Sequence, residues 1–141
     1  LVPSLFCVPS VGAPLFDLPQ EHLGALRDWL AFYRTHQPIF NQGEFQANWV
    51  AGDFQSFVST LGNRRVVAAF SSYPLSLGGP GEALVINATD EGFLRIELNC
   101  SAEAMVEEAS GRPIAGRRRA GPGLQRVECP PGSVLKFRFN D

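Results

Sequence analysis

The chain divides near Pro38 into two parts with different sequence periodicities. Before this point, a single long amphipathic helix is predicted over residues 19–36, with an apolar stripe at three- and four-residue steps: Leu23, Leu26, Leu30 and Tyr33. Pro38 is predicted to end this helix, because proline lacks the amide hydrogen that continues the helical ladder. After it come about a hundred residues of short strands and turns. The division indicates a helical unit that leads into a mainly β domain.

The segment before the helix predicts a short strand and a helix start. Leu5–Val8 is an uninterrupted apolar run and is predicted to be a buried strand. Asp17 lies just before Pro19, where a carboxylate can accept hydrogen bonds from the first helical amides. Glu21 adds a favourable negative charge to the same turn. We therefore expect a strand–loop–helix unit over residues 1–40.

The second part is predicted to be an antiparallel β-sandwich over residues 41–141. Its strands are expected over residues 54–59, 65–70, 83–87, 93–98, 105–108, 125–129 and 134–139. Gly62-Asn63 fits a tight hairpin turn, and residues 93–98 alternate apolar with charged side chains, which indicates one solvated face. Residues 39–45 are expected to be a connector, 74–81 a loop, and 111–123 a polar loop or a hairpin arm.

Composition excludes several classes of function. The 141 residues are 45% hydrophobic and 18% charged, with a formal net charge of −2, so the surface as a whole offers no field that attracts nucleic acid or anionic membranes. No apolar run reaches the roughly 18–20 residues of a membrane span. Three prolines interrupt Leu1–Phe16, which argues against a signal peptide. Because the chain opens on Leu1 and its only methionine is Met105, we expect a fragment or a processed subunit.

The cysteines predict packing rather than metal binding. Cys7, Cys100 and Cys129 are far apart and share no metal-ligand spacing with either histidine, so small buried hydrophobes are the favoured interpretation. If the protein is secreted, a disulfide between Cys100 and Cys129 is an alternative. Two sequons, at Asn87 and Asn99, slightly favour a secreted or lysosomal location.

No residue is predicted to be catalytic, to bind a cofactor or to ligate a metal. The available carboxylates, Asp17, Glu21, Asp28, Glu44, Asp53 and later ones, are expected to be solvated acids, because sequence spacing cannot establish the paired geometry of a glycosidase.

The remaining candidates also have simpler interpretations. His22 and His36 lie about 21 Å apart along a helix, too far to share a metal or a proton. The Arg117–Arg119 run is expected in an exposed loop, and Gly78–Gly81 lacks the following helix of a phosphate site. An aromatic group is expected in the core, although exposed rings would suit sugar stacking: Phe45, Trp49, Phe54 and Phe57.

The helix and its flanks resemble the α-galactosidase (melibiase) type of glycoside hydrolase. The residues that carry the resemblance are 11–23, Trp29–His36 with its Trp-Leu-Ala-Phe-Tyr-Arg-Thr-His sequence, and 40–45 with Gly43-Glu44-Phe45. Residues 64–70, 85–89 and 127–133 resemble later parts of the same group more weakly. Pro38 and the opening loop depart from its commonest wording. The resemblance implies that residues 1–40 are the last strand and helix of a catalytic (β/α)8 barrel, and that residues 41–141 are its C-terminal sandwich.

The resemblance also sets the expected function and partners. It implies an enzyme that hydrolyses α-linked sugars with two aspartates that lie outside this chain, so the chain is not expected to be active alone. The expected partner is the missing barrel portion or a companion chain, through which a carbohydrate substrate is bound, and an oligomer is compatible with this arrangement. The alternatives are a stand-alone carbohydrate-binding sandwich, which requires Trp49 and neighbouring rings in one exposed plane, and a protein-interaction module that docks through the leucine stripe.

Overall fold

The computed structural model describes residues 1–7, 9, 12 and 14–140. Within these residues, two short 3-10 helices and one long α-helix precede ten strands. The elements are η1 (Val2–Phe6), η2 (Leu15–Asp17), α1 (Gln20–Gln42), β1 (Glu44–Val50), β2 (Asp53–Leu61), β3 (Arg64–Ala69), β4 (Leu75–Leu77), β5 (Gly81–Asn87), β6 (Phe93–Leu98), β7 (Ala102–Glu108), β8 (Pro113–Ala120), β9 (Gly123–Glu128) and β10 (Ser133–Phe139).

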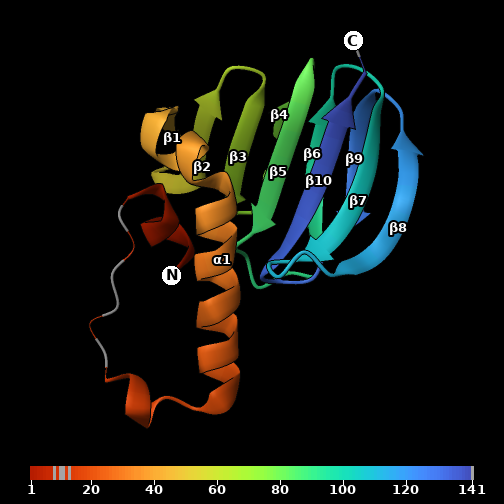
Figure 1. Ribbon diagram of the computed structural model, residues 1–141. Coiled ribbons are helices and arrows are strands. Elements are labelled where there is room, and N and C mark those ends of the chain that lie inside the picture. Colours follow the sequence, from red (N-terminus) through yellow and green to blue (C-terminus); the bar gives the residue numbers. More distant parts are fainter. Residues whose placement is uncertain (8, 10–11, 13, 141) are drawn as a thin grey trace.

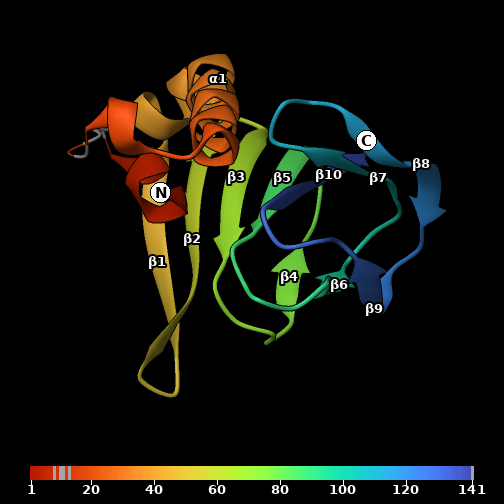
Figure 2. The same cartoon turned by 90° about the horizontal axis from the view of Figure 1, so that it is seen from below.

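The strands form two sheets, and α1 makes a third layer. The larger sheet has seven strands in the order β1-β2-β3-β5-β10-β7-β8, and the smaller has three in the order β4-β6-β9. Figures 1 and 2 show α1 against one face of the larger sheet and the smaller sheet against its other face. β3 and β5 are parallel, as are β4 and β6, while the other pairs are antiparallel. The fold is therefore mainly β with mixed orientation, and the purely antiparallel prediction was wrong. The chain leaves β3, crosses to the smaller sheet as β4, and returns beside β3 as β5.

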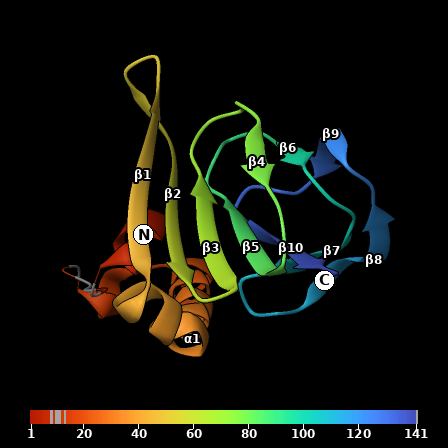
Figure 3. The ribbon, with the colours of Figure 1, turned by 90° about the horizontal axis from the view of Figure 1, so that it is seen from above.

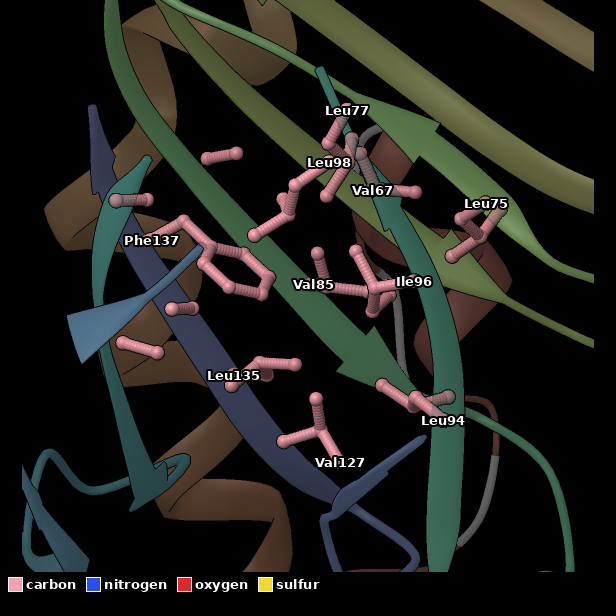
Figure 4. Close-up of a cluster of buried hydrophobic side chains, with 14 of the residues drawn as sticks. Val67, Leu75, Leu77, Val85, Leu94, Ile96, Leu98, Val127, Leu135 and Phe137 are labelled. Atoms are coloured by element: carbon pink, nitrogen blue, oxygen red, sulfur yellow. The ribbon is translucent and has the colours of Figure 1, made fainter. Parts of the chain in front are cut away.

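A dry core lies between the two sheets. Val67 of β3, Val85 of β5 and Phe137 of β10 contribute from the larger sheet, and Leu94 and Ile96 of β6 contribute from the smaller one. Figure 4 shows these side chains pointing toward one another across the gap. Each strand supplies them at alternate positions, since successive side chains point to opposite faces. The alternation predicted for 93–98 is confirmed, with Arg95 and Glu97 exposed.

A second core lies between α1 and the outer face of the larger sheet. Phe32, Ile39 and Phe40 of α1 pack with Leu5 of η1 against buried side chains of three strands: Val66, Leu84, Ile86 and Val134. Pro38 lies inside α1, which continues to Gln42, so the prediction that Pro38 ends the helix was wrong. An internal proline costs about 3 kcal/mol, and burial of Ile39 and Phe40 in the next turn offsets this cost.

The entry to α1 differs from the predicted one. Leu5 and Phe6 belong to the 3-10 helix η1 rather than to a strand, and Val8 lies outside the described residues. Leu5 is buried in the core between α1 and the larger sheet. This burial satisfies the apolar side chain without a strand. Asp17 is in η2, and the N-cap position of α1 is held by Pro19 without a side-chain cap. The predicted capping role of Asp17 was therefore wrong.

The β region contains more strands than were predicted. The hairpin at Gly62-Asn63 is confirmed between β2 and β3. The expected connector 39–45 instead spans the end of α1 and the start of β1, and the expected loop 74–81 contains β4. Of the two interpretations of 111–123, the hairpin arm is correct, because most of it is β8 paired with β7. Gly43 joins α1 to β1 at a turn so tight that a Cβ would clash with the Ile39 carbonyl.

Candidate functional site

The five carboxylates named from the sequence are not brought together. Asp17, Glu21, Glu44 and Asp53 are exposed, and Asp28 is half-buried beside Arg27 at 3.7 Å. Glu44 and Asp53 begin the two antiparallel strands of one hairpin, so they lie at opposite ends of it, about 20 Å apart. Within the described ranges, no three His, Cys, Asp or Glu side chains gather as metal ligands would. These five carboxylates therefore do not form the paired geometry of a glycosidase.

His36 lies in a hollow between α1 and the larger sheet. The hollow encloses about 240 Å³ and is also lined by Phe32, Glu107 and Lys136. The imidazole packs on the Phe32 ring with centroids 4.6 Å apart, and no described group bonds its Nδ1. Burial lowers the pKa of His36 from 6.5 to about 4, with a further lowering from Arg64. His36 is therefore neutral at pH 7 and helps seat the helix. His22 is exposed on the same helix.

The prediction of three buried cysteines is confirmed for Cys129 alone, since Cys7 is exposed and Cys100 is half-buried. All three cysteines are free, so the Cys100–Cys129 disulfide is not formed. Burial raises the pKa of the Cys129 thiol to about 12, which makes it unreactive. Asn87 is buried, and its Nδ2 donates to the carbonyls of Glu91 at 2.8 Å and Cys129 at 2.7 Å. The Asn87 side chain of the first sequon is therefore occupied by hydrogen bonds within the folded chain. Asn99 of the second sequon is exposed.

The arginine run is in a strand rather than a loop. Arg117–Arg119 belong to β8, the edge of the larger sheet, and all three are exposed. Arg119 is opposite Glu103 on β7. Charged side chains on an edge strand oppose pairing with a second chain. The exposed arginines are therefore compatible with an edge strand that stays unpaired on its outer side.

α1 presents two neighbouring apolar faces, of which the sheet covers one. Trp29, Phe32 and Ile39 lie on the covered face. The predicted leucine stripe is centred about 100° further around the helix, since each residue turns it by about that angle. Its leucines are only half-buried, whereas Tyr33, the fourth residue of the predicted stripe, packs against the covered core. η2, which precedes α1, exposes Leu15 at 48% and Phe16 at 101%. We call this set the helical apolar surface: Leu15, Phe16, Leu23, Leu26 and Leu30.

A row of aromatic rings continues from α1 along the β1–β2 hairpin. Phe6 of η1 joins them, with centroids 5.2 Å from Phe40 and 5.8 Å from Phe57. At the far end, Trp49 and Phe54 stack at 3.7 Å with 33° between their planes, and they are 59% and 40% exposed. We call the hairpin part of this row the aromatic ladder: Phe45, Trp49, Phe54 and Phe57. Its rings pack against one another, so they do not lie side by side as a flat platform.

Both apolar features lie at the same end of the molecule. Figure 2 shows the N-terminal segments, α1 and the β1–β2 hairpin together, away from β8 and β9. Among the described residues, six of the nine large exposed apolar side chains belong to this end: Leu1, Leu15, Phe16, Phe45, Trp49 and Phe54. An exposed concentration of this kind marks an interaction surface more often than scattered single residues do. The leucine stripe was predicted from the sequence. Its position beside a second apolar face, which the sheet covers, was not predicted.

Comparison with known proteins supplies no relative. No family model, no curated protein and no solved structure matches this chain. Among the described residues, no helix is both long and apolar enough to cross a membrane.

Proposed function

We propose that this chain is the non-catalytic C-terminal portion of an α-galactosidase-like glycoside hydrolase, which hydrolyses α-linked sugars with aspartates outside this chain. In this proposal, α1 is the last helix of a (β/α)8 barrel, and the two-sheet region is the C-terminal sandwich. The resemblance of residues Trp29–His36 and Gly43–Phe45 to the sequence of that group supports it. The observation that carries it is the double apolar character of α1, because a helix between a barrel and a sandwich needs one apolar face for each.

The occupant of the helical apolar surface is accordingly the preceding part of the barrel. The surface has the apolar chemistry of a domain interior, with Phe16 fully exposed and three leucines half-buried. Obligate interfaces resemble a domain core cut in half, which is the composition found on this side of α1. The sandwich would then brace the barrel through a helix that belongs to both parts.

Two alternatives remain from the sequence. A protein-interaction module would use the same surface for an unrelated partner. A carbohydrate-binding module built on Trp49 is disfavoured in its platform form, because the Phe54 ring stacks against one face of the indole. The two alternatives and the glycosidase proposal differ in partner, so a partner experiment separates them.

The test is co-expression of this chain with the coding region immediately upstream. The proposal predicts a stable complex that hydrolyses p-nitrophenyl α-galactoside, and neither activity nor complex when Leu23→Gln and Leu26→Gln are combined. Leu124→Gln is the matched control, since Leu124 is an exposed leucine of β9 at the other end of the molecule. A complex without glycosidase activity would favour the interaction module, and the absence of any complex would contradict the proposal.

A further inference from the structure

The larger sheet extends beyond the smaller one and leaves an uncovered inner face. In the strand register, Gln46 of β1 is opposite Val58 of β2, which is opposite Val67 of β3. Val67 points into the core between the sheets, so Gln46 points to the same side. Figure 3 shows β1 and β2 reaching away from β4, the nearest strand of the smaller sheet. The core-facing side of the sheet thus continues outward as a polar surface.

This surface forms one wall of a groove whose other wall includes β4. The groove encloses about 400 Å³, and its polar lining consists of neutral amides and hydroxyls: Gln46, Asn48, Gln55, Ser56, Thr60 and Ser76. Val58 is the half-buried apolar side chain of this lining, whereas Val67, Leu75 and Leu77 are buried in the core behind it. Arg65 is the one charged side chain among its described lining residues. A second hollow of about 510 Å³ shares Arg65, Ser76 and Leu77, so the two lie next to each other.

The groove is partly preorganised by its own hydrogen bonds. Asn48 Nδ2 donates to Ser56 Oγ at 3.1 Å, and Gln55 Nε2 donates to the Pro74 carbonyl at 2.9 Å. The Arg65 guanidinium donates to the Gly78 carbonyl and lies over the Phe139 ring, 5.7 Å from its centroid. Side chains held in this way lose less conformational freedom when a ligand binds.

The chemistry of the lining fits a ligand with many hydroxyl groups. A side-chain amide both donates and accepts hydrogen bonds, as a hydroxyl does, so such a wall complements neighbouring sugar hydroxyls. An anion only accepts, and would call for several cations where the groove has one. An extended peptide that adds to a sheet uses backbone groups at a strand edge, whereas these groups are side chains on the face of the sheet.

We propose that this groove, between the inner face of β1–β2 and strand β4, binds an uncharged oligosaccharide. The amides and the exposed hydroxyls of Thr60 and Ser76 bond the sugar hydroxyls, and Val58 contacts a C–H face of a ring. The inference does not depend on the docking role of α1, which is on the opposite side of the larger sheet.

The test is a titration of the full chain, followed by amide NMR shifts, with maltotetraose, cellotetraose and raffinose. We expect at least one of them to shift the groove residues, and Gln46→Ala and Thr60→Val each to weaken its binding about fivefold or more. Gln37→Ala is the matched control, because it removes an exposed amide from α1 and should leave the affinity unchanged. Thermal unfolding of each variant verifies that it is folded.

Three outcomes would overturn the inference. The first is no shift at the groove with any of the three sugars at millimolar concentration, as expected of a merely solvated sheet face. The second is binding that Gln46→Ala and Thr60→Val leave unchanged. The third is binding only of trigalacturonate or of an extended peptide, which would assign the groove to an acidic or a peptide ligand.

Discussion

The two faces of α1 have similar apolar composition but different surroundings. Trp29, Phe32 and Ile39 are buried against the larger sheet, whereas Leu23, Leu26 and Leu30 are only half-buried. An amphipathic pattern therefore predicts that a helix side is apolar, but not which neighbour covers it. The covered face belongs to the core of this chain, and we infer that the other face belongs to an interface. The following predictions test this contrast, beginning with the largest expected effect.

Truncation in the core between the sheets should destabilise the chain most. Phe137 is completely buried, so Phe137→Ala should lower the free energy of unfolding by about 4 kcal/mol. Phe16→Ala removes the same ring from the helical apolar surface, where it is fully exposed, and should change stability by less than about 0.5 kcal/mol. Urea denaturation of both variants measures the difference. Equal losses would mean that Phe16 is covered in solution.

The covered face of α1 should be the next most sensitive. Ile39 is 2% exposed against the sheet, and Ile39→Ala should cost about 3 kcal/mol. Leu23→Ala, on the leucine stripe, should cost less than about 1 kcal/mol in the isolated chain. The same denaturation experiment compares them. A larger loss for Leu23→Ala would place the leucine stripe, and not the Ile39 side, against the sheet.

Replacement of the internal proline should stabilise the helix. Pro38 is exposed, so Pro38→Ala removes no buried contact and supplies an amide hydrogen for the Arg34 carbonyl. We expect a gain of about 2 kcal/mol, somewhat reduced because proline also restricts the unfolded chain. Thermal unfolding measures it. A loss of stability would indicate that the helix ends at this position, as the sequence alone had predicted.

Lowering the pH should reduce the free energy of unfolding through protonation of His36. Its pKa is about 4 in the folded chain and 6.5 when unperturbed, so the unfolded chain takes up the proton first as the pH falls. Stability is therefore complete above about pH 6.5 and declines toward pH 4, by about 1–2 kcal/mol after allowance for solvent screening. Arg64 and Lys136 lower this pKa and Glu82 raises it, and Glu107 and Glu108 also line the hollow.

Two matched variants isolate this histidine. His36→Gln should flatten the decline in stability between pH 6.5 and 4, because glutamine does not titrate. His22→Gln, at the exposed end of the same helix, should leave the pH profile as it is. Denaturant unfolding at several pH values measures both. An unchanged slope in His36→Gln would show that the imidazole is solvated.

Local sequence patterns predicted the elements whose signals are local. The alternation in Phe93–Leu98 and the turn at Gly62-Asn63 gave the β6 strand and the β2–β3 hairpin correctly. The strand β1 was missed, although Phe45, Ala47 and Trp49 alternate with polar residues, because the predicted connector ended at residue 45 and the first predicted strand began at residue 54. The parallel pairing of β3 with β5 depends on the crossing through β4, a long-range arrangement that no local pattern encodes.

Of the two candidate surfaces, one could be predicted from local sequence and the other could not. The leucine stripe could be predicted because helical periodicity is a property of neighbouring residues. The groove could not, because it brings Gln46 and Asn48 of β1 close to Ser76 of β4 only after the two sheets have packed. The run ending at Pro38 misled the prediction, since tertiary burial of Ile39 and Phe40 outweighs the local cost of proline.

The most direct test of the docking account is the behaviour of the purified full chain in sedimentation velocity and in binding of a hydrophobic fluorescent dye. The account predicts that the chain binds the dye or self-associates, and that combined Leu23→Gln, Leu26→Gln and Leu30→Gln substitutions abolish both effects while Leu124→Gln does not. A wild-type chain that sediments as a single monomeric species and does not increase the fluorescence of the dye would contradict this prediction.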